Sequence, residues 1–275
     1  MITAFLGPRG TYTEQAAVQF AGSDAGLLET PNFAAAVKAV EDGRADFAVV
    51  PVENSIEGPV SQSLDILIHD TQLKLCAEVV VPIEHVLVAP PGARLEQITS
   101  VHSHPQALAQ CGRWLDAHLP HAERVAAMST AGAVREVVES GDATAAAIGP
   151  ERAQVLYGGE VLARGIMDAR NNRTRFMALG HTDAEPTGND KTFVAMRMDK
   201  NVPGSLHKAL DPFAAAHVQL TNIITRPTKG RLGEYVFLVD FEGHRKDPRI
   251  AAMLDEVREI TEELKVIGSC PQFVE

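Results

Sequence analysis

The sequence predicts an α/β fold in which a two-lobed domain precedes a smaller unit of alternating strands and helices. In roughly the first 180 residues, short apolar runs repeatedly end in Gly/Pro turns or in residues that start helices. A polar, turn-rich segment follows at 180–190 and is typical of a linker. After it, the order of elements becomes strand, helix, strand, strand, helix, strand, which is a ferredoxin-like βαββαβ unit.

Strand-like runs in the first part alternate with helix starts, the pattern of a largely parallel sheet. They are 2–6, 46–50, 98–101, 125–127 and 145–148. Thr11 has the spacing of a capping box with Glu14, and Ser129 or Thr130 can cap the helix after them. Pro105 and Pro150 suit the first position of a helix. Such helix N-termini favour an anion, although every α/β protein has turns of this kind.

Two apolar segments read as crossings between the lobes. Segment 78–89 is interrupted by Pro82, and segment 165–179 returns the chain to the first lobe. We therefore expect a bilobed domain over 1–182 with its second lobe at about 83–164 and a ligand cleft between the lobes.

The predicted C-terminal unit covers 190–275. Its strands are expected at 191–198, 218–226, 234–242 and 264–269, and its helices at 203–217 and 248–263.

Composition excludes several classes of protein. The net charge is −11, and residues 1–189 have 13 Lys and Arg against 23 Asp and Glu, so nucleic acid is not an expected partner. No segment has the length of a membrane span, and the first residues lack the features of a signal peptide. Three widely spaced cysteines are not in paired metal spacing, and we expect reduced thiols in a cytoplasmic protein.

Six segments resemble the prephenate dehydratase family in order and approximate spacing. They are 7–17 (GPRGTYTEQAA), 52–58 (VENSIEG), 104–108 (HPQAL), 129–131 (STA), 147–149 (AIG) and 171–176 (NNRTRF). Further segments resemble the ACT domain that accompanies this catalytic domain: 203–210 (PGSLHKAL), 225–227 (TRP), 234–237 (EYVF) and 240–244 (DFEGH). The resemblance implies a periplasmic-binding-protein-like catalytic domain followed by an ACT regulatory domain.

The reaction implied by this resemblance is a decarboxylating elimination of water from prephenate, which gives phenylpyruvate in phenylalanine biosynthesis. It requires no metal and no other cofactor, because formation of the aromatic ring drives it. The enzyme then has to orient the substrate dianion and assist departure of its hydroxyl group.

The resemblance also implies roles for individual residues. Thr174 of the Thr-Arg-Phe motif is the predicted contact of the leaving hydroxyl, as an oriented hydrogen-bond donor or relay. Glu53 and Asn54 are placed at the cleft, where Glu53 would affect proton traffic or order the site, and Asn54 would bond a carboxylate or the hydroxyl. Alternatively, Asn54 caps its own loop.

Residues expected to bind the substrate carboxylates come from the basic stretch 168–175 and from the helix starts. Arg175 offers a bidentate fork and matches the motif, whereas Arg173 occupies a position that the motif leaves open. A surface ion pair is the alternative for either arginine. The remaining predicted contacts are Thr11, Ser103, Gln106, Ser129 and Thr130.

The ACT-like segment departs from the family pattern. Where the family commonly has Asn-Leu-Thr-x-Ile-Glu-Ser-Arg-Pro, this chain has 219–227 QLTNIITRP, and Cys270 stands where tyrosine is usual. The resemblance implies phenylalanine as a feedback effector at a subunit interface in a homodimer or homotetramer. Predicted effector contacts are Gly204, Leu206, Gln219 and Leu220. Alternatively, the unit only builds the oligomer.

Two other functions remain open. Arogenate dehydratase uses the same chemistry on the aminated substrate, and a non-enzymatic amino-acid or keto-acid sensor would use a similar cleft. Thr174 within an intact motif favours an enzyme. His102, His104 and Cys111 lack the further ligands of a zinc site. We expect no fused chorismate mutase, because the first predicted strand begins at Ile2.

Overall fold

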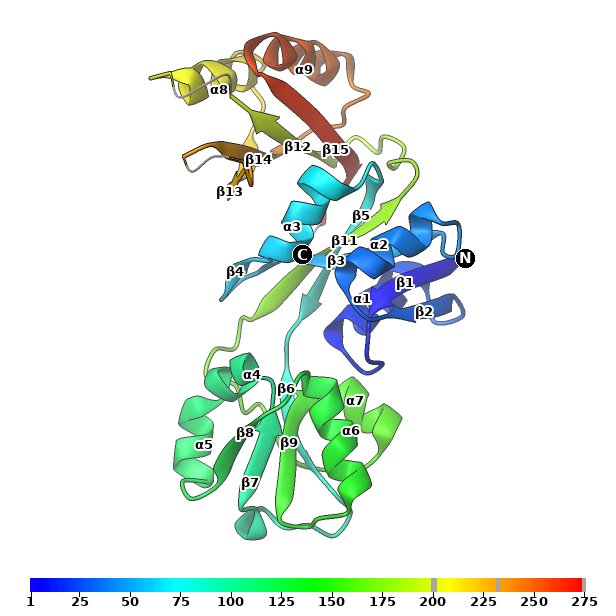
Figure 1. The fold of residues 1–275 in the computed structure, drawn as a ribbon, viewed down its shortest axis with the longest axis vertical. Coiled ribbons are helices and arrows are strands. Elements are labelled where there is room, and N and C mark those ends of the chain that lie inside the picture. The colour runs from blue at the N-terminus through cyan, green and yellow to red at the C-terminus, as the bar shows by residue number, and fades with distance from the viewer. Residues whose placement is uncertain (199–201, 231–232, 274–275) are drawn as a thin grey trace.

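The computed structural model describes residues 1–198, 202–230 and 233–273. Figure 1 shows a chain arranged as three units along one axis, with the first lobe in the middle and the second lobe at one end. The C-terminal unit lies at the opposite end, against the first lobe. Two segments of chain connect the lobes.

The first lobe is built on a mixed sheet with helices on it. Its strands are β1 (Ile2–Leu6), β2 (Gly26–Thr30), β3 (Phe47–Asn54), β4 (Gly58–Pro59), β5 (Lys74–Pro82) and β11 (Arg173–Gly180). Its helices are α1 (Tyr12–Ala21), α2 (Phe33–Glu41), α3 (Ser61–Asp65) and the π-helical turn η1 (Ile66–Asp70). Strand β1 pairs in parallel with β2 and β3, whereas β11 is antiparallel to both β3 and β5.

The second lobe contains a five-stranded sheet in the order β10-β6-β9-β7-β8. Its elements are β6 (His85–Ala89), η2 (Leu95–Gln97), β7 (Ser100–Ser103), α4 (Pro105–Gln110), α5 (Gly112–His118), β8 (Glu123–Ala126), α6 (Thr130–Ser140), β9 (Ala145–Pro150), α7 (Glu151–Tyr157) and β10 (Glu160–Arg164). Apolar side chains cover both faces of this sheet.

The crossings between lobes are shorter than the sequence indicated. Most of 78–89 is strand, because β5 ends at Pro82 and β6 begins at His85. The return crossing is 165–172, and β11 starts at Arg173. Strands β6, β10 and β11 run antiparallel to their neighbours, and β5 is antiparallel to β11, so the sheets are mixed rather than largely parallel.

The helix starts follow local side-chain chemistry. The Thr11 side chain accepts a hydrogen bond from the Glu14 N–H at the start of α1, and Ser129 does the same for Gly132 at the start of α6. Pro105 is in the first turn of α4. Pro150, however, is the N-cap of α7 and the last residue of β9, one position earlier than expected.

The C-terminal unit has the βαββαβ order. It consists of β12 (Asp190–Arg197), α8 (Ser205–Ala215), β13 (Leu220–Pro227), β14 (Tyr235–Glu242), α9 (Pro248–Ile260) and β15 (Glu263–Pro271). Helices α8 and α9 cover one face of its antiparallel sheet, and in Figure 1 they lie on the side away from the first lobe.

The C-terminal unit is joined to the first lobe through its sheet and its core. Strand β15 pairs with β5 at Gly268 and Leu75, so one ten-stranded sheet runs through both units. A Cβ on Gly268 would lie 2.6 Å from the Leu75 amide nitrogen, and its φ is 154°, so this contact requires glycine. A single apolar cluster also includes residues of both units, such as Leu67 and Phe193. The two units therefore share a core.

No helix in the described parts of the chain is both long enough and apolar enough to span a membrane.

Candidate active site

A cavity of about 240 Å³ lies between the two lobes. The first lobe contributes residues from α1, β3 and β11, and the second lobe contributes the starts of α4 and α6. The lining residues are Tyr12, Asn54, Ile83, His85, His104, Gln106, Ala107, Gln110, Met128, Ser129, Thr130, Asn172 and Thr174.

Asn54 and Thr174 face each other at the ends of two paired strands. They are register partners of β3 and β11, and the Asn54 Nδ2 lies 2.9 Å from the Thr174 Oγ1. The Asn54 Oδ1 accepts hydrogen bonds from the backbone N–H groups of Ile56 and Glu57, both at 3.0 Å. Because an oxygen must occupy that position, the amide nitrogen has to point at Thr174.

This arrangement determines what the Thr174 hydroxyl can do. Its oxygen accepts a hydrogen bond from Asn54, so its own hydrogen is available for a different acceptor. Both side chains are 9% exposed and line the cavity. The Thr174 hydroxyl can therefore donate a hydrogen bond to an acceptor in this cavity.

Asn172 extends this network to the other lobe. Its Oδ1 accepts from the Asn54 Nδ2 at 2.7 Å, and its Nδ2 donates to the Gln110 Oε1 at 3.0 Å. Gln110 is the last residue of α4, and its Nε2 lies 3.4 Å from the Glu57 Oε1. Since Asn172 is buried and both of its amide atoms are bonded, it holds the two sides of the cavity in register.

Tyr12 and His85 form the next part of the wall. The Tyr12 hydroxyl lies 3.1 Å from the His85 Nδ1 and donates to the Glu84 carbonyl at 2.5 Å. Burial lowers the pKa of His85 to about 4, partly opposed by a hydrogen bond with Gln110, so the imidazole is neutral near pH 7. Burial also raises the pKa of Tyr12 well above its usual value. Both groups are therefore uncharged.

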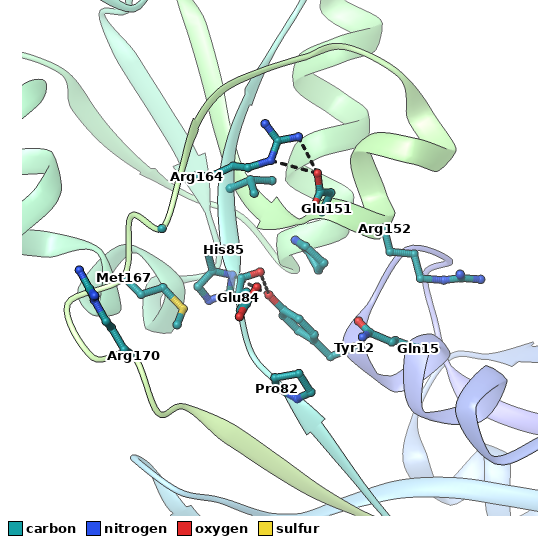
Figure 2. A pocket seen from close by; sticks show the side chains of 13 residues that line it. Tyr12, Gln15, Pro82, Glu84, His85, Glu151, Arg152, Arg164, Met167 and Arg170 are labelled. Atoms are coloured by element: carbon teal, nitrogen blue, oxygen red, sulfur yellow. Dashed lines mark hydrogen bonds and ion pairs between the residues drawn. The ribbon is translucent and has the colours of Figure 1, made fainter.

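A second cavity of about 580 Å³ shares Tyr12 and His85 with the first. Figure 2 shows these two side chains beside Glu84, with Arg164 bonded to Glu151 further along the wall. Across the lobes, Arg152 is paired with the buried Glu14 of α1 at 2.9 Å. The arginines of this wall are thus largely engaged by carboxylates of the protein.

The first cavity is lined by uncharged or imidazole side chains. Among the described residues that line it there is no Lys, Arg, Asp or Glu. Positive potential comes instead from the N-terminus of α6, an 11-residue helix that begins at Thr130 beside the cavity. An anion would be held by neutral donors and by this helix end.

Five residues that the sequence singled out line this cavity. They are Asn54, Gln106, Ser129, Thr130 and Thr174.

The Thr11 and Ser103 hydroxyl groups form hydrogen bonds with the protein backbone instead. Thr11 caps α1, and its neighbour Tyr12 takes the place at the cavity. Ser103 is fully buried, and its hydroxyl donates to the Ile148 carbonyl at 2.6 Å, across the second-lobe sheet. Neither residue is among those that line this cavity, and their contact with substrate stays a prediction.

Glu53 and Arg175 lie on the other side of the sheet from Asn54 and Thr174. Successive side chains of a strand alternate between faces, so residues next to Asn54 and Thr174 must point away from the cavity. The Arg175 guanidinium instead bonds Glu53 at 2.8 Å and Asp240 at 2.7 Å. The expected carboxylate fork for substrate is therefore occupied by carboxylates of the protein, and Glu53 is not at the cavity.

Sequence reasoning did not single out seven further residues of the wall: Tyr12, Ile83, His85, Ala107, Gln110, Met128 and Asn172. One signal was available for Asn172, because it lies two residues before Thr174 and so shares its face in an extended chain. The others meet the site only through the packing of the two lobes.

The predicted effector residues lie in the C-terminal unit, away from this cavity. Gly204 is the N-cap of α8 with a φ of 86°, and Leu206 and Leu220 pack against the core under α8 and α9. Gln219 is exposed, and its Nε2 donates to the Leu220 carbonyl at 2.8 Å. Their binding role stays a prediction.

The described residues form no cluster of potential metal ligands. Across residues 1–198, 202–230 and 233–273, no group of three or more His, Cys, Asp and Glu side chains is placed to hold an ion. The His102 Nε2 lies 3.0 Å from the Ser100 hydroxyl.

A bilobed α/β domain with a polar interlobe cavity and an oriented hydroxyl defines the class of small-molecule enzymes and binding proteins. Comparison with known proteins identifies one family within this class, because residues 3–184 match the family model described as prephenate dehydratase. The chain belongs to the prephenate dehydratase family.

Relatives match over almost the whole chain. A bifunctional chorismate mutase/prephenate dehydratase of Neisseria gonorrhoeae is 42% identical over 271 residues, which are 98% of this chain and 74% of that protein. A prephenate dehydratase of Mycolicibacterium gilvum is 38% identical over 98% of this chain and 90% of its own length.

Solved structures of similar proteins match the fold of almost the whole chain. The prephenate dehydratase of Arthrobacter aurescens in complex with L-Phe has a TM-score of 0.91 at 38% identity, over 99% of this chain and 90% of that chain. A protein described as a quorum-quenching acylase, GqqA, has a TM-score of 0.89 at 34% identity, over 99% of this chain and 98% of that chain.

Asn172→Ala should lower prephenate turnover on the order of 100-fold, because Asn54 and Gln110 lose the amide that holds them in place. Asn171→Ala is the matched control, since the neighbouring side chain is exposed and only its carbonyl is bonded, to Ser55. Steady-state kinetics of both variants would decide, and equal turnover in the two would contradict this role.

Neutral His85 should make folding sensitive to mild acid. Its folded pKa of about 4 is below the ordinary value of 6.5, so its stabilising contribution is full above pH 6.5 and is lost as pH falls toward 4. Wild type should therefore lose about 2 kcal/mol more than His85→Gln between pH 7 and pH 5 in urea unfolding. His121→Gln, at an exposed histidine, should retain the wild-type pH dependence. Equal losses in wild type and His85→Gln would refute the assignment.

Proposed function

We propose that the chain converts prephenate into phenylpyruvate, water and carbon dioxide, with the Thr174 hydroxyl bonded to the departing hydroxyl of the substrate. The observation that carries this proposal is the Asn54–Thr174 pair, which points an O–H donor into the interlobe cavity. Family membership supplies the substrate and the reaction, a carbon–oxygen lyase reaction with decarboxylation.

The chemistry needs little from the protein besides orientation. The bond to the ring carboxylate breaks, its electrons enter the ring, and the C–OH bond breaks on the other side as the ring becomes aromatic. One proton joins the leaving hydroxide to give water. A threonine hydroxyl is a weak acid, so Thr174 acts as a hydrogen-bond donor that stabilises the growing negative charge on this oxygen or relays a proton to it.

Asn54 has the supporting role in this proposal. By donating to the Thr174 oxygen at 2.9 Å, it fixes the direction in which the threonine hydrogen can point. It also makes that hydrogen more acidic, because a hydrogen bond accepted by a hydroxyl oxygen polarises its O–H group.

The substrate carboxylates would lie against the second lobe. Ser129 and Thr130 present the first turn of α6, and Gln106 adds an amide at the start of α4. Helix ends and neutral donors suit a dianion that must also release one carboxylate as carbon dioxide, because a tight ion pair would stabilise the ground state and oppose its loss.

We further propose that the C-terminal unit is an ACT domain that binds phenylalanine as a feedback inhibitor. Its βαββαβ order supports this, as does the L-Phe bound in the related protein of Arthrobacter aurescens. Gly204, Leu206, Gln219 and Leu220 are the proposed contacts.

A homodimer or homotetramer in the cytoplasm is also proposed. Strand β13 is the last strand at one end of the ten-stranded sheet, with side chains alternately exposed, so its edge suits pairing with another subunit. All three cysteines are unpaired, which fits a reducing compartment.

Thr174→Val should lower kcat for prephenate by at least about 100-fold with an unaltered fold, because the isosteric side chain lacks the hydroxyl. Thr174→Ser should recover much of the lost rate. Phenylpyruvate formation is the measurement, with arogenate assayed in parallel to separate the two dehydratase activities. Turnover of neither substrate by the wild type would favour a ligand sensor, and near-normal turnover by Thr174→Val would remove this residue from the mechanism.

Phenylalanine at millimolar concentration should lower prephenate turnover of the wild type, whereas alanine should not. Gly204→Ala should weaken this inhibition about tenfold relative to its own uninhibited rate, because a φ of 86° strains any residue with a Cβ at the start of α8. Gly188→Ala is the matched control, since this linker glycine has a φ of 89° and equally open surroundings. Identical dose–response curves for both variants would argue against an effector site at Gly204.

A further inference from the structure

A group of charged and polar side chains joins the C-terminal unit to the strand pair that contains Thr174. Arg175 of β11 contacts Glu53 of β3 at 2.8 Å, Glu78 of β5 at 3.1 Å and Asp240 of β14 at 2.7 Å. Asn222 of β13 lies 3.4 Å from the Glu53 carboxylate. We call these five residues the Arg175 junction.

The junction joins one strand pair of the first lobe to one strand pair of the C-terminal unit. Glu53 and Arg175 are register partners in the first lobe, and Asn222 and Asp240 are register partners in the C-terminal unit. Each first-lobe member bonds one C-terminal member, Glu53 with Asn222 and Arg175 with Asp240. A movement of the β13–β14 pair relative to the first lobe would therefore act on both β3 and β11 at once.

The same strand pair contains the proposed catalytic residues. Asn54 and Thr174 are the register partners immediately next to Glu53 and Arg175. They differ only in facing the opposite side of the sheet, where they form the 2.9 Å hydrogen bond at the cavity. The junction and the site thus lie one residue apart on two strands.

The junction has an excess of negative charge, and its members other than Glu53, which is 35% exposed, are largely buried. The side chains of Glu78 and Asp240 are 1% and 4% exposed, and that of Arg175 is 14% exposed. Lys191 adds a second cation 3.9 Å from Glu78, and the Cys270 thiol and the Asp190 carboxyl are further titratable groups nearby. Burial raises the pKa of Asp240 to about 6 despite the attraction of Arg175, so its charge is held at a cost. Arg175 also stacks on Phe193 of β12, 5.2 Å from the ring centre.

Another ion-pair contact between these units does not reach the site. Arg226 of β13 bonds Asp65 at 2.9 Å and Ser61 at 2.8 Å, and both partners are on α3. This contact attaches the C-terminal unit to a helix rather than to β3 or β11. A change at this contact can therefore serve as a control for a change at the Arg175 junction.

From these contacts we infer that Arg175 is a positioning residue and that the Arg175 junction transmits the state of the C-terminal unit to Thr174. The inference rests on the proposed role of Thr174. Asp240 and Asn222 hold Glu53 and Arg175, and this sets the separation of Asn54 and Thr174 on the opposite face. Leu220, a proposed effector contact, is two residues from Asn222 on the same strand. An effector that shifts β13 would alter the aim of the Thr174 hydroxyl without touching the cavity.

The test uses the full chain and two variants that each neutralise one carboxylate at the boundary between the units. Asp240→Asn alters the junction, and Asp65→Asn alters the contact on α3. Asp240→Asn should lower kcat for prephenate at least about tenfold with KM within about threefold, because substrate binding by the second lobe is intact. Asp65→Asn should keep kcat within about twofold of wild type. Equal kcat in wild type and Asp240→Asn, or equal losses in both variants, would overturn the inference.

A second measurement does not depend on the substrate. Amide hydrogen exchange of residues 173–176 and 52–54 should be at least about tenfold faster in Asp240→Asn than in Asp65→Asn, because the strand pair loses one of its attachments. Unchanged exchange in Asp240→Asn would overturn the junction whatever the enzyme acts on. A wild type that leaves prephenate untouched while the exchange differs as expected would reject the proposed function and retain the junction.

Discussion

The antiparallel pairing of β3 with β11 is the contact on which the site depends. It joins β3, a strand from the first pass through the first lobe, to β11, the strand by which the chain returns from the second lobe. Pairing brings Asn54 to Thr174 on one face and Glu53 to Arg175 on the other. Because side chains of a strand alternate, a single register fixes both the cavity wall and the attachment of the C-terminal unit. A slip by one residue would exchange the two.

The electrostatics of the two faces differ for a physical reason. On the cavity face, the lining side chains are amides, hydroxyls, imidazoles and apolar groups, and the anion-favouring element is the start of α6. On the other face, several carboxylates gather around one guanidinium in a nearly dry interface. A guanidinium in the cavity would hold the substrate carboxylate too firmly, whereas at the interface it offsets charges that burial would otherwise make unstable.

Much of the fold could be predicted from local patterns. The βαββαβ order after the linker matches the elements of the C-terminal unit, and Thr11 and Ser129 cap helices as their spacing indicated. Local patterns are less informative at the crossings between the lobes. The sequence predicts that 78–89 connects the lobes, although most of this segment belongs to strands β5 and β6. Strands that are buried on both faces read as continuous apolar runs without polar alternation. The apolar residues on either side of Pro82 therefore do not show where β5 ends and β6 begins. The prediction of a largely parallel sheet was wrong, because the direction of a strand that returns from the second lobe depends on how it pairs in the first lobe.

The sequence by itself determined the family, the βαββαβ unit and the segments that surround the cavity, because these depend on short motifs and on the period of apolar residues. Only the tertiary structure decided which side chain of each motif faces the cavity. Arg175 and Thr174 are neighbours in one motif, yet the register of β3 and β11 sends one to the C-terminal unit and the other to the interlobe cavity. His85 and Gln110 join the site through the packing of the two lobes, and such contacts leave no mark on the local sequence.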